Sequence, residues 1–221
     1  SKGKGGSMHL FDLKRHFYGG HGIVGASVPI GAGLAFADKY KGNNNVTYCY
    51  FGDGAANQGQ VYETFNMAKL WNLPVLFIIE NNHYAMGTSL KRASSIDELH
   101  KRGIGFNIPG KKINGMDIFE VIKEGKKAVD YVRSGNGPII LEMDTYRYRG
   151  HSMSDPATYR SKEELNSLLP KDKISKGSLD FSAAFNIGIP EFYQQMFDMV
   201  KEGKDTIAGV KEKNAPLLQK L

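Results

Sequence analysis

The amino-acid sequence predicts an α/β fold, a mostly parallel sheet with helices on both faces. Three segments carry this prediction: an apolar run at Val46–Phe51, a helical pattern at Ala56–Trp71, and a second apolar run at Val75–Ile79. Short, continuous apolar runs rich in β-branched and aromatic residues are typical of strands buried in a parallel sheet. Because a helix joins the two strands, we expect them to run parallel and to organise the rest of the domain.

The elements before this unit are a glycine-rich start, a loop and one helix. Residues 1–6 are flexible by composition, and Phe17–Gly25 reads as a loop. Ile30–Tyr40 predicts a helix with a face of small residues that includes Gly31 and Ala35. Small side chains let a helix backbone approach its neighbours closely, so we expect this face to pack tightly against the sheet or another helix.

The elements after the unit are less regular at first. Arg92–Gly110 is irregular, with a short helix start at Ser94–Glu98. Asp117 is a good N-cap for an amphipathic helix, and Gly135 ends that helix. Its apolar face carries Ile118, Val121, Ile122, Gly125, Val129 and Val132. Ile139–Asp144 then predicts a further strand of the sheet.

Polar residues follow both strands of the organising unit at the point where each strand ends. Asp53 lies in a Gly-Asp-Gly turn, and Asn82 comes 29 positions later. The carboxyl ends of parallel strands meet at one edge, where open α/β sheets bind ligands. The Asp53 carboxylate, the Asn82 amide and the Tyr84 carbonyl offer oxygen atoms of the kind Mg²⁺ takes. Gly54 and Ala55 offer backbone N–H groups to an anion, which predicts a metal–diphosphate site.

The wider sequence around these turns resembles one enzyme family. A Gly-Asp-Gly turn alone usually only reverses the chain, but GDGAANQGQ, ENN-x-Y-x-MGTS, GKGGSMH, FYGGHGIVGA and TYRYRGHSMSDP occur together. In this combination they are similar to alpha subunits of the thiamine-diphosphate-dependent decarboxylase component of the pyruvate dehydrogenase complex. The resemblance covers Gly3–Glu164, and we expect no match beyond it.

The resemblance implies a thiamine-diphosphate-binding fold that supplies the diphosphate and Mg²⁺ half of the site. Backbone groups of Gly22 and Val24 would bind the aminopyrimidine ring, and His151 would act at the phosphates or the active-site mouth. The implied partners are a beta subunit in an α2β2 heterotetramer, which supplies the activating glutamate, and a lipoyl acyltransferase core. The implied reaction is oxidative decarboxylation of pyruvate. Ser89 and Ser152 match serines that are phosphorylated in mitochondrial relatives.

Other polar residues near these motifs allow more than one interpretation of their role. His9 is either a surface histidine or, by the GKGGSMH resemblance, a residue near the active-site mouth. His21 sits in the glycine loop and could simply cap a turn. Arg147 and Arg149 could bind the diphosphate or an acidic substrate. They could equally form ion pairs with Glu142 or Asp144, as acidic residues of the preceding strand.

Composition limits the class of protein. The 221 residues carry a net charge of +6 with scattered lysines, so nucleic-acid binding is not expected, and no apolar run is long enough to span a membrane. The single cysteine, Cys49, is expected in the core, which fits a reducing compartment such as the bacterial cytoplasm or the mitochondrial matrix. Because residue 1 is not methionine, we expect an N-terminal truncation. Residues 1–164 should form the cofactor-binding domain and 165–221 a helical tail, with a helix at Glu191–Ala208.

Three alternatives stay open. The pattern Gly20-x-Gly22-x-x-Gly25 matches a dinucleotide-binding loop, but no strand leads into it and Pro29 comes before the expected helix, which argues against an NAD site. Within the enzyme class, the substrate could be a branched-chain 2-oxo acid or acetoin. The chain could also be a non-catalytic homologue that binds the cofactor or assists assembly.

Overall fold

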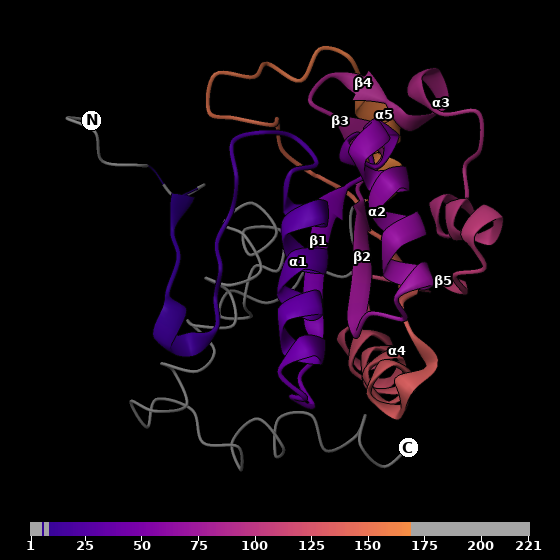
Figure 1. Ribbon diagram of the computed structural model, residues 1–221. Helices are drawn as coiled ribbons and strands as arrows, with labels where there is room; N and C mark the ends of the chain where they lie inside the picture. The colour runs from indigo at the N-terminus through magenta and orange to yellow at the C-terminus, as the bar shows by residue number, and fades with distance from the viewer. Residues whose placement is uncertain (1–5, 7–8, 169–221) are drawn as a thin grey trace, which may run out of the picture. The chain divides into compact units, whose positions relative to one another are not determined.

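The computed structural model describes residue 6 and residues 9–168, and contacts divide the chain into two units. The first unit runs through Tyr146 and also includes His151–Tyr159. It holds the sheet and the turns at its edge (Figure 1). The second unit includes Arg147–Gly150 and, among the described residues, the short helix α5 (Lys162–Leu168). The helix expected at Glu191–Ala208 lies outside the described residues.

The sheet of the first unit has four parallel strands in the order β1-β2-β6-β5. These are β1 (Thr47–Gly52), β2 (Val75–Asn81), β6 (Ile139–Asp144) and β5 (Gly110–Asn114). The predicted parallel arrangement of the organising unit is therefore confirmed. Because all four strands point the same way, their carboxyl ends lie along one edge.

Helices cover both faces of this sheet, as predicted. On one face, α1 (Ser27–Tyr40) and α2 (Gly59–Leu70) pack with Phe77 in the larger core cluster. On the other face, α4 (Ile118–Tyr131) packs with Ile78 in a second cluster. Neighbouring residues of a strand point to opposite faces, which is why β2 contributes to both clusters. Figure 1 shows α1 and α2 side by side with β1 and β2.

The small-residue face of α1 packs closely on β1, as expected. A Cβ atom at Gly31 would lie 2.9 Å from the sulfur of Cys49, so a larger residue would push the helix away. Cys49 is buried, and its thiol donates to the backbone oxygen of Ser27 at 3.3 Å. Burial raises the pKa of the Cys49 thiol to about 12, which suits a packing role rather than a reactive one.

Several predicted boundaries need correction. The first strand begins and ends one residue later than predicted, and the second extends to Asn81. The predicted helix at Ala56–Trp71 is divided into a 3₁₀ turn, η3 (Ala55–Asn57), and α2. The expectation that Pro29 delays the first helix is wrong, because α1 already begins at Ser27. Proline is accepted in the first helical turn, where a backbone N–H has no partner within the helix.

Some elements have no counterpart in the predictions. They are η2 (Leu13–Arg15), the hairpin of β3 (Tyr84–Ala85) and β4 (Thr88–Ser89), α3 (Leu90–Ala93), η4 (Leu99–Phe106), the edge strand β5 and the π-helical turn η5 (Val132–Asn136). The segment Arg92–Gly110 is thus more regular than expected, since η4 takes up most of its second half.

The helix α4 starts as predicted, but the face that it buries differs from the predicted apolar face. The Asp117 side chain accepts from the backbone N–H groups of Phe119 and Glu120, which confirms the N-cap. Glu124 is buried, whereas Ile122 of the predicted apolar face is exposed. Glu124 is tolerated inside because two lysines neutralise it: Lys111 Nζ lies 2.6 Å and Lys127 Nζ 2.9 Å from its carboxylate oxygens.

We expect Glu124 to make the stability of the protein depend on acid pH. Hydrogen bonds from Lys111 and Lys127 lower the pKa of Glu124 to about 2 from the usual 4.5. A carboxyl group with a lowered folded-state pKa stabilises the fold above its unfolded pKa, so this contribution should disappear as pH falls from about 4.5 to about 2. Chemical denaturation across this range should show a smaller loss for Glu124→Gln than for the wild type. The exposed Glu63→Gln variant should behave as the wild type does.

Among the described residues, none of the helices is both long and apolar enough to cross a membrane.

Candidate cofactor site

Two turns meet at the carboxyl edge of the sheet. The first turn follows β1 and carries Asp53 and Gly54, and the second turn follows β2 and carries Asn82 and Tyr84. Gly52 pairs with Glu80 in the parallel register, so Asp53 lies level with Asn81 and one residue short of Asn82. Asp53 is 3% exposed, and Asn82 is half-buried. The two predicted oxygen donors therefore follow neighbouring strands at the same edge.

The two turns touch through Gly54. A Cβ atom built on Gly54 would lie only 2.4 Å from the Cβ atom of Ala85, much closer than side chains allow. Only glycine fits this position, because the backbone of the first turn lies directly against the second. The contact joins the segment that carries Asp53 to the segment that carries Asn82 and Tyr84.

The second turn is shaped by its own asparagines. The backbone N–H of His83 donates to Asn81 Oδ1 at 3.1 Å, and the N–H of Tyr84 donates to Asn82 Oδ1 at 3.2 Å. His83 adopts a left-handed backbone conformation with φ of 69°. An amide oxygen has two lone pairs. The Asn82 oxygen is therefore oriented by one hydrogen bond and keeps a lone pair for a cation.

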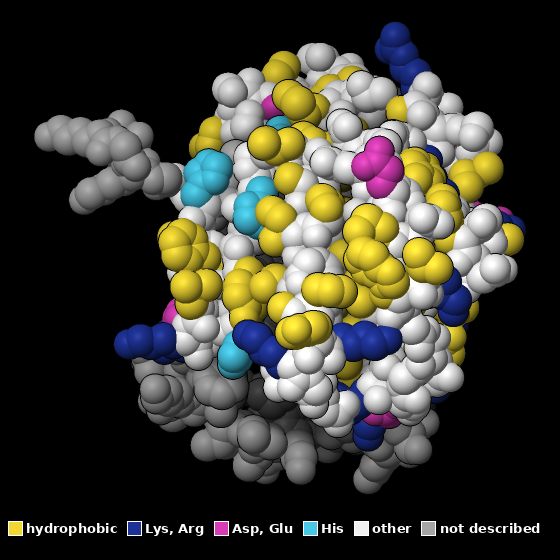
Figure 2. All heavy atoms as spheres, viewed as in Figure 1, with side chains coloured by type: hydrophobic (Ala, Val, Ile, Leu, Met, Phe, Trp, Pro, Cys, Tyr) yellow, Lys and Arg dark blue, Asp and Glu magenta, His cyan; other side chains and the backbone are white. Residues whose placement is uncertain are grey.

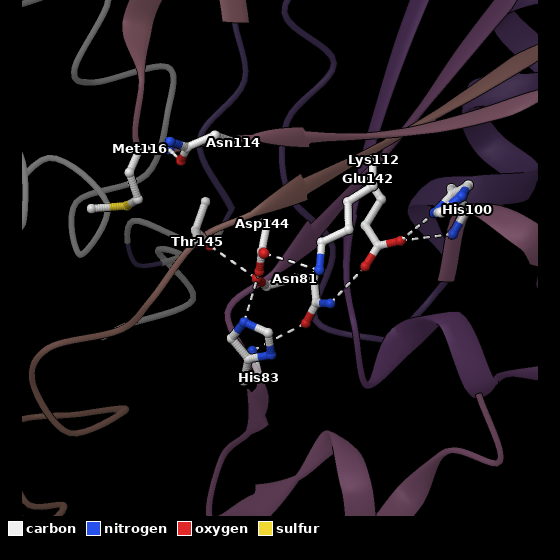
Figure 3. Close-up of polar contacts among 9 residues, drawn as sticks. All are labelled: Asn81, His83, His100, Lys112, Asn114, Met116, Glu142, Asp144 and Thr145. Carbon is white, nitrogen blue, oxygen red and sulfur yellow. Dashed lines mark hydrogen bonds and ion pairs between the residues drawn. The ribbon is translucent and has the colours of Figure 1, made fainter. Parts of the chain in front are cut away.

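Beneath this turn, a polar network ties β2 to β6 and η4 (Figure 3). Asn81 Nδ2 donates to Glu142 Oε1 at 2.7 Å, and both side chains are fully buried. The other carboxylate oxygen of Glu142 accepts from the backbone N–H of His100 at 2.9 Å, with His100 Nδ1 at 2.9 Å. The Asn81 backbone oxygen accepts from the N–H of Thr145 at 2.9 Å. The network holds the residue just before Asn82 in place.

A second set of charged contacts lies beside the first. His83 Nε2 is 2.7 Å from one oxygen of Asp144, and Lys112 Nζ is 2.9 Å from the other (Figure 3). Partial burial acts to lower the pKa of Lys112, but the hydrogen bond and charge of Asp144 outweigh it and raise that pKa. On the opposite face of the sheet, burial raises the pKa of the Glu80 carboxyl to about 7.

The glycine loop predicted to bind a flat ring is fixed to the start of α2. Gln60 Nε2 donates to the backbone oxygen of Val24 at 3.0 Å. Gly25 has φ of 82°, and a Cβ atom there would lie 2.9 Å from Gln60 Nε2. A Cβ atom at Gly22 would meet the His9 ring at 3.3 Å, so His9 lies against this loop. Gly22 and Val24 are exposed, which leaves their outer side open to a ligand.

The loop that carries His151 is connected to the second turn. The backbone N–H of His151 and the hydroxyl of Tyr159 both donate to Asp155 Oδ2, at 2.7 and 2.8 Å. The Tyr159 ring packs on the Tyr84 ring, with centroids 5.4 Å apart. His151 itself is exposed. These contacts anchor the His151 loop to the turn that holds Asn82.

The segment His83–Ser89 forms a short hairpin whose tip, Met86–Thr88, is exposed. Tyr84 is 8% exposed and pairs with Ser89 in the β3–β4 hairpin, which leaves Ser89 half-buried. Ser152 is exposed, and its hydroxyl lies 3.1 Å from that of Ser154. Of the two predicted phosphorylation sites, Ser152 is the more exposed.

Arg147 and Arg149 belong to the second unit. The ion-pair alternative for these arginines involved Glu142 and Asp144. The structure gives both carboxylates other partners: Glu142 contacts Asn81 and His100, and Asp144 contacts His83 and Lys112. Within its own unit, Arg160 donates to the backbone oxygens of Arg147 and Tyr148.

The two turns carry oxygen atoms of the kinds that a hard divalent cation takes. They include the buried carboxylate of Asp53 and the amide oxygen of Asn82, which the N–H of Tyr84 orients. Within the part of the chain that the structure describes, no group of three or more His, Cys, Asp or Glu side chains could hold a metal. A site built from one carboxylate and neutral oxygens would not need such a group.

Comparison with known proteins decides the family. The model of the dehydrogenase E1 component family matches residues 1–177, which is well over half of the chain. The chain belongs to the dehydrogenase E1 component family.

Named members of the family align closely with the chain. Pyruvate dehydrogenase E1 component subunit alpha of Rhizobium meliloti is 55% identical over 209 residues, covering 93% of this chain and 60% of that protein. The Rickettsia felis protein of the same name is 57% identical over 205 residues, covering 91% and 63%. The mitochondrial Dictyostelium discoideum protein is 60% identical over 167 residues, covering 75% and 43%. The chain thus spans between 43% and 63% of the length of these E1 alpha subunits.

The expectation that the resemblance ends near Glu164 is wrong. The family match extends to residue 177, and alignments with bacterial E1 alpha subunits cover up to 96% of the chain. The tail therefore resembles the family as well, and the proposed division at residue 164 stays a prediction.

Several residues of the site carry no recognisable motif. They are His100, Lys112, Glu142 and Asp144, which form the network beneath the second turn together with Asn81 of the ENN motif. Glu142 did give a signal, since a carboxyl group within the apolar run Ile139–Asp144 must find a buried partner. Its partners could not be named, because they depend on how β2 and η4 meet β6.

Proposed function

We propose that this chain is the alpha subunit of a pyruvate dehydrogenase E1 component. The proposed reaction is the thiamine-diphosphate-dependent oxidative decarboxylation of pyruvate, with transfer of the acetyl group to a lipoyl acyltransferase. The contact of Gly54 with Ala85 carries this proposal, because it joins the two turns whose oxygens would hold the metal. Family membership and the names of the aligned relatives support it.

Each residue of the site has a proposed role. The Asp53 carboxylate, the Asn82 amide oxygen and the Tyr84 backbone carbonyl would bind Mg²⁺. Backbone N–H groups of Gly54 and Ala55 would bind the diphosphate. Two further contacts complete the set: Gly22 and Val24 would bind the aminopyrimidine through their backbones, and His151 would bind phosphate or substrate at the mouth of the site.

Thiamine diphosphate, when bound, supplies the nucleophilic carbon and the electron sink that decarboxylation requires. The chain's own residues would bind this cofactor and orient it. Buried Asp53 places one negative charge where a divalent cation can offset both it and the diphosphate. Gln60 holds the Val24 carbonyl and so fixes the loop against which a flat ring can lie. His151, exposed at its loop, can donate a hydrogen bond from a ring N–H to an anionic oxygen.

The proposed partners are a beta subunit, which would form an α2β2 heterotetramer and supply the carboxylate that activates the aminopyrimidine, and a lipoyl acyltransferase core. We place the protein in the bacterial cytoplasm or the mitochondrial matrix. Decarboxylation by this chain in the absence of any beta subunit would contradict the proposal. Assays of the complex with pyruvate, branched-chain 2-oxo acids and acetoin should show the highest kcat/KM for pyruvate.

Replacing Asp53 tests the metal site directly. In the complex with the beta subunit, Asp53→Asn should weaken binding of thiamine diphosphate in the presence of Mg²⁺ by more than about 100-fold, since even outer-shell changes at metal sites cost 10- to 100-fold. Isothermal titration calorimetry measures this dissociation constant. The exposed Asp130→Asn variant is the matched control and should bind as the wild type does. Unchanged binding by Asp53→Asn would remove Asp53 from the metal site.

A further inference from the structure

Arg102 connects the first turn to two other segments of the chain. It lies in η4, and its guanidinium donates to the backbone oxygen of Ala56 and, at 2.8 Å, to Asn57 Oδ1, both in η3. The same group donates to the Tyr62 hydroxyl of α2 at 2.9 Å and to Ser94 Oγ at 2.7 Å. One side chain thus holds η3, which begins at Ala55 directly after Asp53 and Gly54, by two hydrogen bonds.

The element that carries Arg102 is itself fixed to the sheet. His100, two residues earlier, donates its backbone N–H to buried Glu142 of β6. A Cβ atom at the following residue, Gly103, would lie 2.7 Å from the Ile108 oxygen and from Ile140 Cδ1, so η4 packs directly on β6. Arg102 therefore links the first turn to a rigid part of the core.

Among the described residues, no acidic side chain forms an ion pair with Arg102. All four acceptors are neutral oxygens, and none of the ion pairs among the described residues includes Arg102. The guanidinium keeps its charge at any ordinary pH. Ala56 directly follows Ala55, so this charge lies within about 10 Å of the proposed diphosphate contacts, a distance over which salt screens it only partly.

We propose that Arg102 is a positioning residue for the cofactor site. It holds η3 so that the N–H groups of Gly54 and Ala55 face the diphosphate, and it brings near that anion a positive charge that no ion pair among the described residues neutralises. This inference rests on the proposed function. It assigns to η4, an element far from the cofactor motifs in the sequence, a part in cofactor affinity.

The test separates the hydrogen bonds of Arg102 from its charge. Arg102→Lys keeps the charge but cannot form the four-bond fork, whereas Arg102→Gln keeps some hydrogen bonding and loses the charge. In the complex with the beta subunit, the dissociation constant of thiamine diphosphate at saturating Mg²⁺ should rise about tenfold or more for each variant, since hydrogen bonds from a charged group are strong. For Arg102→Gln, this constant should also depend less on salt concentration than in the wild type.

Two further readouts distinguish positioning from general destabilisation. At saturating cofactor, kcat should stay within about twofold of the wild type, because the residue does not touch the reacting atoms. Lys101→Gln, which removes only the exposed ion pair with Glu98, should leave both constants unchanged. If the Arg102 variants do not fold, Tyr62→Phe and Ser94→Ala remove one acceptor each and should produce smaller rises in the same dissociation constant.

The outcomes are distinct. Failure of the wild-type complex to bind thiamine diphosphate would overturn the proposed function itself. Tight binding by the wild type together with unchanged binding by Arg102→Lys and Arg102→Gln would overturn only the role of Arg102. A fall in kcat at saturating cofactor with unchanged affinity would also contradict a positioning role in binding.

Discussion

Replacing Gly54 with alanine is expected to abolish useful cofactor binding. The added Cβ atom would lie 2.4 Å from the Cβ atom of Ala85, so the two turns would have to separate. A misplacement of about 1 Å in an active site can cost about 100-fold in reaction rate, and we expect a loss of similar size for cofactor affinity, because the diphosphate and metal contacts lie in the displaced turns. We therefore expect the dissociation constant of thiamine diphosphate with Mg²⁺, measured by calorimetry on the complex with the beta subunit, to rise by about that factor or more.

The geometry also provides a rescue variant. Combining Gly54→Ala with Ala85→Gly removes the Cβ atom that causes the clash, and the next neighbour, Ala85 Cα, would lie at an acceptable 3.6 Å. The double variant should recover most of the lost affinity. Gly59→Ala is a suitable control, because a Cβ atom there meets nothing within 4 Å. Wild-type affinity in Gly54→Ala would show that the contact between the turns does not shape the site.

Replacing Glu142 with alanine is expected to cause the largest loss of stability. Its carboxylate is fully buried and accepts from Asn81 Nδ2 and from the backbone N–H of His100. Each buried donor left without an acceptor costs about 1–3 kcal/mol, and the lost side-chain volume adds to this. The free energy of unfolding of the full chain, measured by chemical denaturation, should therefore fall by several kcal/mol.

Two further glutamate variants serve as references for this loss in the free energy of unfolding. Glu142→Gln keeps one acceptor oxygen and nearly the same shape, so it should lose less stability than Glu142→Ala. Glu63→Ala on the exposed side of α2 should change stability by no more than about 0.5 kcal/mol. Equal stabilities for Glu142→Ala and Glu63→Ala would mean that the network contributes nothing to the fold.

The sheet could be predicted where its strands are apolar. Residues 139–144 form the predicted strand with the predicted bounds, and β1 and β2 differ from prediction by one or two residues at their ends. The strand β5 escaped prediction because its sequence, GKKIN, has a single apolar side chain. Lysines are common on strands at sheet edges, where they discourage pairing with other chains, and β5 is such a strand. Only the neighbouring β6 makes it a strand.

The site, too, could be predicted from the sequence only in part. Asp53 and Asn82 could be placed at one edge because the parallel strands before them are recognisable in the sequence. The roles of Glu142, His100 and Arg102 could not be predicted, because each depends on a contact between elements 40 or more positions apart. The orientation of α4, with Glu124 inward, likewise follows from the position of Lys111 on β5.

The order of the strands affects how the protein is made. Leu76 of β2 pairs with Ile139 of β6, which is translated 63 residues later. The largely apolar strand β2 is therefore synthesised well before its neighbour β6. At ribosomal speeds of about 5–20 residues per second, this interval lasts about 3–13 s. During that time β2 has β1 on one edge and no partner on the other, and late-closing parallel sheets of this kind expose the nascent chain to aggregation. Chaperone binding during translation should therefore centre on the segment Val75–Ile79.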